Sequence, residues 1–114
     1  MPLPEFTRKL IEVKLFKYCL NRIPEEARHN VKLNFKINEN EVTLILTRPY
    51  FRNPSKWAER SVAQIRFDNN IKRWQLFFID KKNSWRPYDL IQPSADFDDL
   101  LKELDRDPTG VFWG

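Results

Sequence analysis

The stretch that decides the fold of this chain runs from Ser61 to Tyr88. Its segments are Ser61-Val-Ala-Gln-Ile-Arg-Phe67, Asp68-Asn-Asn70, Trp74-Gln-Leu-Phe-Phe-Ile79, Asp80-Lys-Lys-Asn-Ser84 and Trp85-Arg-Pro-Tyr88. Runs rich in aromatic and β-branched residues alternate with Asp, Asn, Ser and Lys, a pattern typical of antiparallel strands joined by short turns. The run Trp74–Ile79 is apolar on both faces. We therefore expect it in the middle of a sheet, with its second face covered or offered to a partner.

Two further strands are predicted upstream of this stretch. Residues Val31–Ile37 alternate strictly between apolar and polar side chains, and Glu41–Arg48 follows after a short turn. The prolines of Arg48–Pro54 predict a break in the sheet, because proline is excluded from central strands. Ser55 can then cap a short helical stretch that ends at Arg60 and crosses a sheet edge.

Helices are predicted at both ends of the chain. The first spans Pro4–Ile23, and a helical turn at Glu25–Asn30 follows. Its apolar face is predicted to comprise Ile11, Leu15 and Cys19 with Phe16, Leu20 and Ile23 on adjoining rows. The last helix is capped by Ser94 or Asp96 and packs through Phe97, Leu100, Leu101 and Leu104. A turn at Asp107–Gly110 reverses the chain, so that the tail Val111–Gly114 is expected to dock on the core.

These elements predict an α+β fold. We expect an antiparallel, meander-like sheet of about five strands, with the N-terminal and C-terminal helices packed on one face. The chain of 114 residues contains no internal repeat, linker or low-complexity segment. Residues 1–114 are therefore interpreted as a single domain.

Composition places the chain among globular proteins. Hydrophobic residues make up 41% and charged residues 32%, and the net charge is +4. Cys19 is the only cysteine, which excludes a disulfide within the chain and favours a reducing compartment. No signal peptide and no apolar run long enough to cross a membrane is visible. The expected location is the cytoplasm, without membrane association.

An ordered set of residues along the chain resembles a known family. The set comprises Tyr18-Cys19, Arg22, Pro24, Arg28, Arg48-Pro49, Pro54, Trp74, Trp85, Tyr88, Asp107-Pro108 and Phe112-Trp113-Gly114. In order and over nearly the whole chain, it is similar to the bacterial domain of unknown function family 3024. Arg86 departs from the pattern, since a histidine is expected after Trp85. The resemblance implies a bacterial, cytoplasmic, stand-alone domain, and it implies no activity, cofactor or partner.

Catalytic chemistry finds little support in the residues present. Cys19 is expected in the apolar face of a helix, and His29 is the only histidine and lies in a polar connection. The two glycines, Gly110 and Gly114, cannot form a phosphate-binding loop. Acidic residues at the start of the last helix are interpreted as helix-stabilising rather than metal-binding. We expect no enzymatic activity, no cofactor, no metal and no small-molecule substrate.

A non-catalytic binding or regulatory role is therefore the leading hypothesis, with RNA or DNA as the partner. Basic groups neutralise phosphates while exposed rings stack on bases. The predicted surface combines a basic, aromatic sheet face with the Arg48–Arg60 segment, where Phe51, Lys56 and Trp57 repeat the same mixture. Its candidate residues are Lys32, Lys36, Arg48, Tyr50, Arg52, Arg66, Arg86 and Tyr88. The alternative is a self-associating interaction or structural module, a homodimer or the receptor of another protein, that buries the second apolar face of Trp74–Ile79.

Overall fold

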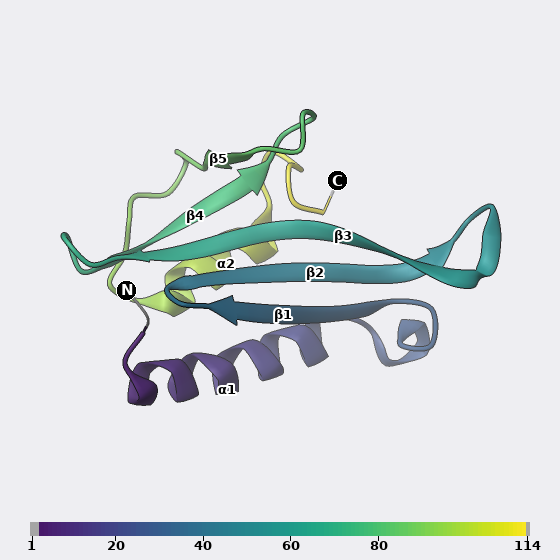
Figure 1. Cartoon of the computed structure of the whole chain (residues 1–114), viewed down its shortest axis with the longest axis horizontal. Coiled ribbons are helices and arrows are strands. Elements are labelled where there is room, and N and C mark those ends of the chain that lie inside the picture. The colour runs from purple at the N-terminus through teal and green to yellow at the C-terminus, as the bar shows by residue number, and fades with distance from the viewer. Residues whose placement is uncertain (1–2, 114) are drawn as a thin grey trace.

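The computed structural model describes residues 3–113 and has the predicted α+β architecture (Figure 1). A single antiparallel sheet has the strand order β1-β2-β3-β4-β5, a simple meander. Its strands are β1 (Lys32–Asn38), β2 (Glu41–Tyr50), β3 (Asn53–Asp68), β4 (Arg73–Ile79) and β5 (Trp85–Pro87). The helices are α1 (Glu5–Arg22) and α2 (Phe97–Arg106), with a short 3-10 helix, η1 (Glu25–Ala27), between α1 and β1.

Strand register places one row of apolar side chains against the helices. Leu33 pairs with Leu46 across β1 and β2, Val42 pairs with Ile65 across β2 and β3, and Ile65 continues to Leu76 in β4. Because side chains alternate between sheet faces, these positions all lie on the same face. A register shift between Leu44 and Ile45 leaves Val62 as an extra residue in β3, which locally bends the sheet.

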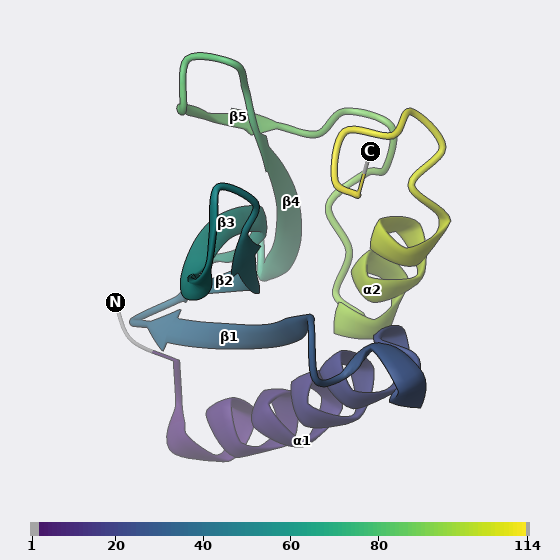
Figure 2. The ribbon, with the colours of Figure 1, turned by 90° about the vertical axis from the view of Figure 1, so that its right-hand side faces the viewer.

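Both helices cover this face, as the sequence predicts. Helix α1 packs against β1 and α2, while α2 packs against β4. Figure 2 shows β1 next to α1, with β4 and β5 farther from that helix. Lys14 Nζ lies 2.6 Å from Asp98 Oδ2 and joins the two helices. The α2 N-terminus is capped by Asp96, whose Oδ1 accepts a hydrogen bond of 3.0 Å from the Asp98 N–H.

Aromatic rings form the middle of the core. The Trp74 ring lies 4.9 Å, between centroids, from both Phe67 and Phe97, in edge-to-face arrangements that favour aromatic packing. The backbone of Trp74 exchanges two hydrogen bonds with Ser94, so the segment before α2 is fixed along β4. Phe112 is fully buried in the same core. The C-terminal tail through Trp113 thus docks on the body of the domain, as predicted; Gly114 lies outside the described residues.

Two local predictions are wrong. Residues Ser55–Arg60 are not helical, and they do not cross an edge; they belong to β3, which pairs with an extended β2 as far as Tyr50. Proline is tolerated here because β1 ends opposite Thr47, so that this part of β2 has one free edge. On α1, Phe16 and Leu20 are exposed rather than part of the core face.

No helix within residues 3–113 has both the length and the apolar composition that crossing a membrane requires.

Candidate nucleic-acid interface

The most distinctive surface feature is a two-stranded hairpin that projects beyond the sheet (Figure 1). We define the β2–β3 ribbon as residues 48–58. Arg48 pairs with Ala58, Pro49 with Trp57 and Tyr50 with Asn53. A register shift between Pro49 and Tyr50 leaves residues 54–56 of β3 outside this pairing, so the ladder is regular only as far as Pro49 and Trp57. Strand β1 ends opposite Thr47 and β4 ends opposite Ala63, so neither neighbouring strand accompanies the ribbon.

The ribbon carries three cationic and three aromatic side chains and no acidic residue. The cations are Arg48, Arg52 and Lys56, and the rings are Tyr50, Phe51 and Trp57. All six side chains are exposed, and Phe51 at the tip is the most accessible of the three aromatic residues, at 79%. Within residues 3–113, no ion pair involves the three cations. Their positive charge is therefore directed to solvent.

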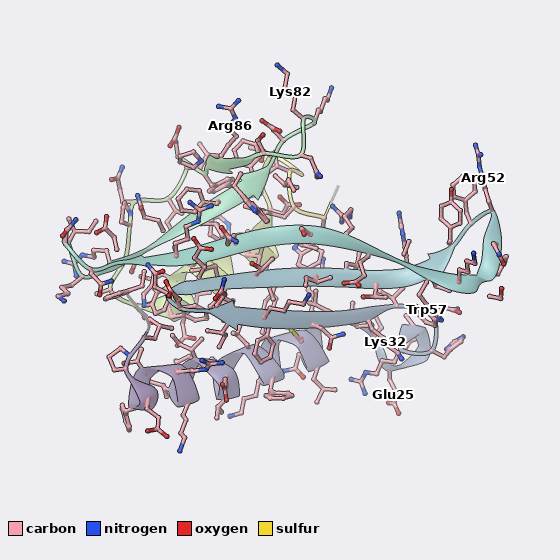
Figure 3. The ribbon with its side chains drawn as sticks, viewed as in Figure 1. Glu25, Lys32, Arg52, Trp57, Lys82 and Arg86 are labelled. Carbon is pink, nitrogen blue, oxygen red and sulfur yellow. The ribbon has the colours of Figure 1, made fainter. Side chains whose placement is uncertain are left out.

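The rings of the ribbon lie close to cationic groups. The Arg52 guanidinium carbon is 5.4 Å from the Phe51 ring centroid, and the Tyr50 and Phe51 centroids are 5.4 Å apart. Trp57 lies near the base of the ribbon, with the Lys32 ammonium 5.2 Å from its ring centroid (Figure 3). Lys32 of β1 thus extends the basic surface of the ribbon onto the sheet. Lys36, two pleats along β1 on the same face, is also exposed.

Arg66 lies on the face of the sheet away from the helices, but its charge is engaged. Its Nε donates a hydrogen bond of 2.6 Å to Gln64 Oε1 and lies 3.7 Å from Glu41 Oε1. The guanidinium also covers the Phe77 ring, 4.0 Å from its centroid. Phe77 is consequently buried, although no helix lies over it. The second apolar face of β4 is thus covered in part, at Phe77, while Ile79 on the same face is half-buried.

Tyr88 does not belong to the surface, which corrects the prediction made for it. Its side chain is only 6% exposed, and its hydroxyl donates a hydrogen bond of 2.8 Å to Glu103 Oε2. Its ring centroid lies 5.0 Å from that of Phe112. Burial and the Glu103 carboxylate raise the pKa of Tyr88 to about 12. The prediction extended the strand alternation through Tyr88, whereas β5 ends at Pro87.

Arg86 is exposed but lies apart from the ribbon. It belongs to β5, the opposite edge strand of the sheet, where its Nε is 2.8 Å from Asp80 Oδ2. This hydrogen bond is the main reason that the pKa of Asp80 is lowered. Figure 3 shows Arg86 near Lys82 and far from Arg52. Of the predicted residues, the structure gathers Lys32, Arg48, Tyr50 and Arg52 in one region.

The sequence profile of one family covers this chain almost completely. The family described as "Domain of unknown function (DUF3024)" matches residues 3–114. The chain belongs to this family. No curated protein and no solved structure matches it.

The other potentially reactive side chains of this DUF3024 domain are Cys19, His29 and the acidic residues of α2, and their contacts favour structural roles. Burial raises the pKa of the Cys19 thiol to about 11, which disfavours the nucleophilic thiolate. His29 is exposed and shares a hydrogen bond of 3.1 Å with Asn30. The acidic residues of α2 serve packing: Asp98 pairs with Lys14, Asp99 accepts a hydrogen bond from Ser94, and Glu103 accepts from Tyr88 and Arg106.

Proposed function

We propose that this DUF3024 domain binds single-stranded nucleic acid through the β2–β3 ribbon, with Lys32 at its base and Lys36 farther along β1 on the same face of the sheet. One observation carries the proposal. An acid-free ribbon projects from the sheet and exposes three cations without ion-pair partners among the described residues, together with three aromatic rings. Such a surface presents the two kinds of group that a nucleic-acid strand recognises.

The cations supply the affinity for the backbone. Each phosphate neutralised by Lys or Arg releases counterions, so binding is favoured at low salt. Arg48, Arg52 and Lys56 lose no ion pair within residues 3–113 when they meet a phosphate. By contrast, Arg66 and Arg86 would have to leave Glu41 and Asp80. The proposed surface therefore centres on the ribbon and excludes Arg66, Arg86 and the buried Tyr88.

The rings favour a single strand over a duplex. Stacking of a base on an aromatic side chain contributes about 1–3 kcal/mol per base, and it requires bases that are not already stacked in a helix. Phe51 at the tip and Trp57 near the base could each accept a base at the two ends of the ribbon. Because every base has a flat face, this arrangement predicts weak dependence on sequence and leaves the choice between RNA and DNA to experiment.

Fluorescence anisotropy tests the proposal. Labelled single-stranded RNA, single-stranded DNA and duplex DNA of equal length are each titrated with the full chain across a series of salt concentrations. We expect saturable binding that weakens as salt rises, with at least one single strand bound more tightly than the duplex. Flat curves at low salt would refute nucleic-acid binding. Equal affinity for single strands and duplex would refute the role assigned to the rings.

A further inference from the structure

Helix α1 has a second apolar face that points away from the core. Ile11 and Leu15 are buried against the sheet, yet five large apolar side chains of the same helix are exposed. We define the α1 stripe as these five residues: Phe6 (80% exposed), Leu10 (49%), Val13 (53%), Phe16 (68%) and Leu20 (57%). Phe16 forms the border of the stripe toward the sheet, because its ring centroid lies 5.4 Å from that of Phe35 in β1. Figures 1 and 2 show α1 along the outside of the molecule, with no other element on its far side.

Four of the five stripe residues, together with Lys17 and without Phe16, have the spacing of a helix–helix seam. Phe6, Leu10, Val13, residue 17 and Leu20 follow one another at alternating intervals of four and three residues. This is the heptad pattern of positions that interlock when two helices pack side by side. The one polar member of the seam is Lys17. A single polar residue in an otherwise apolar seam is a known means of fixing the orientation of two helices.

The area of the stripe is large for a monomer. With each large apolar side chain offering on the order of 150–200 Å² when fully exposed, the stripe presents roughly 500 Å². A symmetric pair would bury on the order of 1,000 Å² from the stripes alone, near the lower end of the range for specific interfaces. The size fits a reversible dimer.

A hollow lies beside the C-terminal end of the stripe. A groove of about 270 Å³ is lined mainly by apolar residues of α1 and of the segment that enters β1. They include Phe16, Cys19, Leu20, Ile23, Val31 and Leu33. At the other end of the stripe, the Phe6 ring is the most exposed of the five side chains. One surface thus carries both a protruding ring and a hollow.

We propose that the α1 stripe binds the α1 stripe of a second copy of this chain, with the two helices antiparallel. A two-fold axis at Val13 places Phe6 of each copy opposite Leu20 of the other. Phe6 and Leu20 are 14 residues apart in sequence, about 21 Å along the helix at 1.5 Å per residue. Each ring then reaches the groove of the second copy. The contact is self-complementary, as a two-fold symmetric interface requires.

Lys17 selects the antiparallel orientation. In a parallel pair the two Lys17 ammonium groups would face each other in the seam, and the repulsion would oppose association. In the antiparallel pair centred on Val13, each Lys17 lies level with Lys9 of the other copy, which pairs with Glu5, and one residue away from Leu10. The flexible stem of Lys17 can carry its ammonium group to solvent. Val13, which has a short side chain, then meets its own copy at the axis.

The sheet offers a weaker surface for self-association. On its uncovered face, Phe77 and Ile45 are buried, Phe77 beneath the Arg66 guanidinium, and Ile79 is half-buried. The dimer proposed here does not depend on nucleic-acid binding, because the α1 stripe and the β2–β3 ribbon share no residue.

Sedimentation equilibrium of the full chain tests the association. We expect a concentration-dependent mass that approaches twice the 13.8 kDa of one chain, with a dissociation constant in the micromolar range. Val13→Glu places two carboxylates at the axis and should yield a monomer whose unfolding transition is unchanged, since the side chain is exposed. Leu90→Glu, an equal change at an exposed leucine outside α1, should leave the dimer intact. A wild-type chain that stays monomeric throughout overturns the proposal.

Cysteine cross-linking tests the orientation in a Cys19→Ala background. Under mild oxidation, Val13→Cys should form a disulfide-linked pair, because the two thiols meet at the axis. Lys17→Cys should not, since the two substituted positions lie about 12 Å apart along the antiparallel helices, too far for a disulfide. A mixture of Leu10→Cys and Lys17→Cys chains should cross-link. Efficient linking of Lys17→Cys to itself would indicate parallel helices and overturn the proposed arrangement.

Discussion

The guanidinium of Arg60 donates a hydrogen bond of 3.1 Å from Nη1 to the carbonyl oxygen of Phe112. This contact joins the base of the β2–β3 ribbon to the C-terminal tail. Asp107 fixes the tail from the other side, because its two carboxylate oxygens accept from the backbone N–H groups of Phe112 and Trp113. The Trp113 indole also donates to the Leu104 carbonyl oxygen at 2.9 Å. The tail is therefore part of the core and is joined to β3 two residues beyond the ribbon.

Truncation of the Phe112 ring should strongly destabilise the fold. We expect Phe112→Ala to lower the free energy of unfolding by about 3–5 kcal/mol, because the fully buried ring leaves a cavity. Urea denaturation followed by circular dichroism measures the change. Val111→Ala, at an exposed neighbour, should change the free energy by less than about 0.5 kcal/mol. A midpoint that is unaltered in Phe112→Ala would contradict the docking of the tail.

The Tyr88 hydroxyl should matter for stability and not for binding. Tyr88→Phe removes the hydrogen bond to the buried Glu103 carboxylate, and we expect it to lower the free energy of unfolding by about 1.5–3 kcal/mol at neutral pH. Thermal unfolding checks the loss, and anisotropy checks that the affinity for a single strand is unchanged. Weaker binding of a single strand with no loss of stability would contradict the burial of Tyr88 and indicate that its side chain belongs to the binding surface.

Cys19 should make the fold sensitive to alkaline pH. Burial raises the pKa of its thiol from 9.0 to about 11 in the folded chain, so the unfolded chain loses its proton first as pH rises. The contribution of the protonated thiol to the free energy of unfolding is therefore fully present below pH 9, and it is lost as the pH rises from 9 to 11. Tyr18 and Tyr88, whose pKa values are also raised, act in the same direction.

A comparison of variants isolates the thiol. Urea unfolding of wild type and Cys19→Ala is measured at pH 7 and at pH 10. Tyr88 contributes equally to both chains, and Cys19→Ala removes both the thiol and the part of the Tyr18 pKa shift that the thiol causes. The wild type should therefore lose more stability between these pH values than Cys19→Ala. Equal losses would show that the thiol has its ordinary pKa in the folded chain.

The Phe51 ring should distinguish stacking from charge attraction. We expect Phe51→Ala to weaken binding of a single strand by about 5- to 100-fold, the equivalent of about 1–3 kcal/mol, and to leave duplex binding nearly unchanged. The side chain is exposed, so stability should not change. Ile71→Ala, at an exposed residue in the β3–β4 turn, is the matched control. Equal weakening of single-strand and duplex binding would show that the Phe51 ring does not act by stacking on unpaired bases.

Much of the fold follows from local sequence patterns. Strict alternation in Lys32–Asn38 and the short polar turns between the later strands are sufficient to predict a meander, because each strand pairs with its neighbour in sequence. The cap at Asp96 and the apolar spacing of Phe97–Arg106 predict the last helix in the same way. Local patterns succeed where the partner of each element lies next to it in the chain.

The errors arise where tertiary context decides. Pro49 and Pro54 indicate a break, yet a ribbon with a free edge accommodates both prolines. Helix α1 carries apolar residues around most of its circumference, so sequence alone does not show which ones face the sheet. The heptad spacing of Phe6, Leu10, Val13 and Leu20 is visible in the sequence, but its meaning emerges only once Ile11 and Leu15 are seen to occupy the core.

The candidate surface could be predicted only in part from sequence. The basic and aromatic mixture of Arg48–Trp57 is a property of composition. It can therefore be predicted even though residues 55–60 form a strand rather than the expected helix. The sequence also predicts Arg66 and Arg86 as part of this surface, because it does not show their ion-pair partners, Glu41 and Asp80, which are brought to them by strand register and turn geometry. Charge counts do not show which cations are already engaged.

The salt dependence of single-strand binding tests the central claim most directly. The slope of log affinity against log salt is compared for wild type, for Arg48→Gln/Arg52→Gln/Lys56→Gln and for the control Lys81→Gln/Lys82→Gln/Lys102→Gln. Both triple variants lose the same charge at exposed positions, but only the first alters the ribbon. We predict that the ribbon variant binds much more weakly, with a slope reduced by about 2, at about 0.7 per lost phosphate contact, while the control keeps the wild-type slope. Equal slopes in all three proteins would contradict the account.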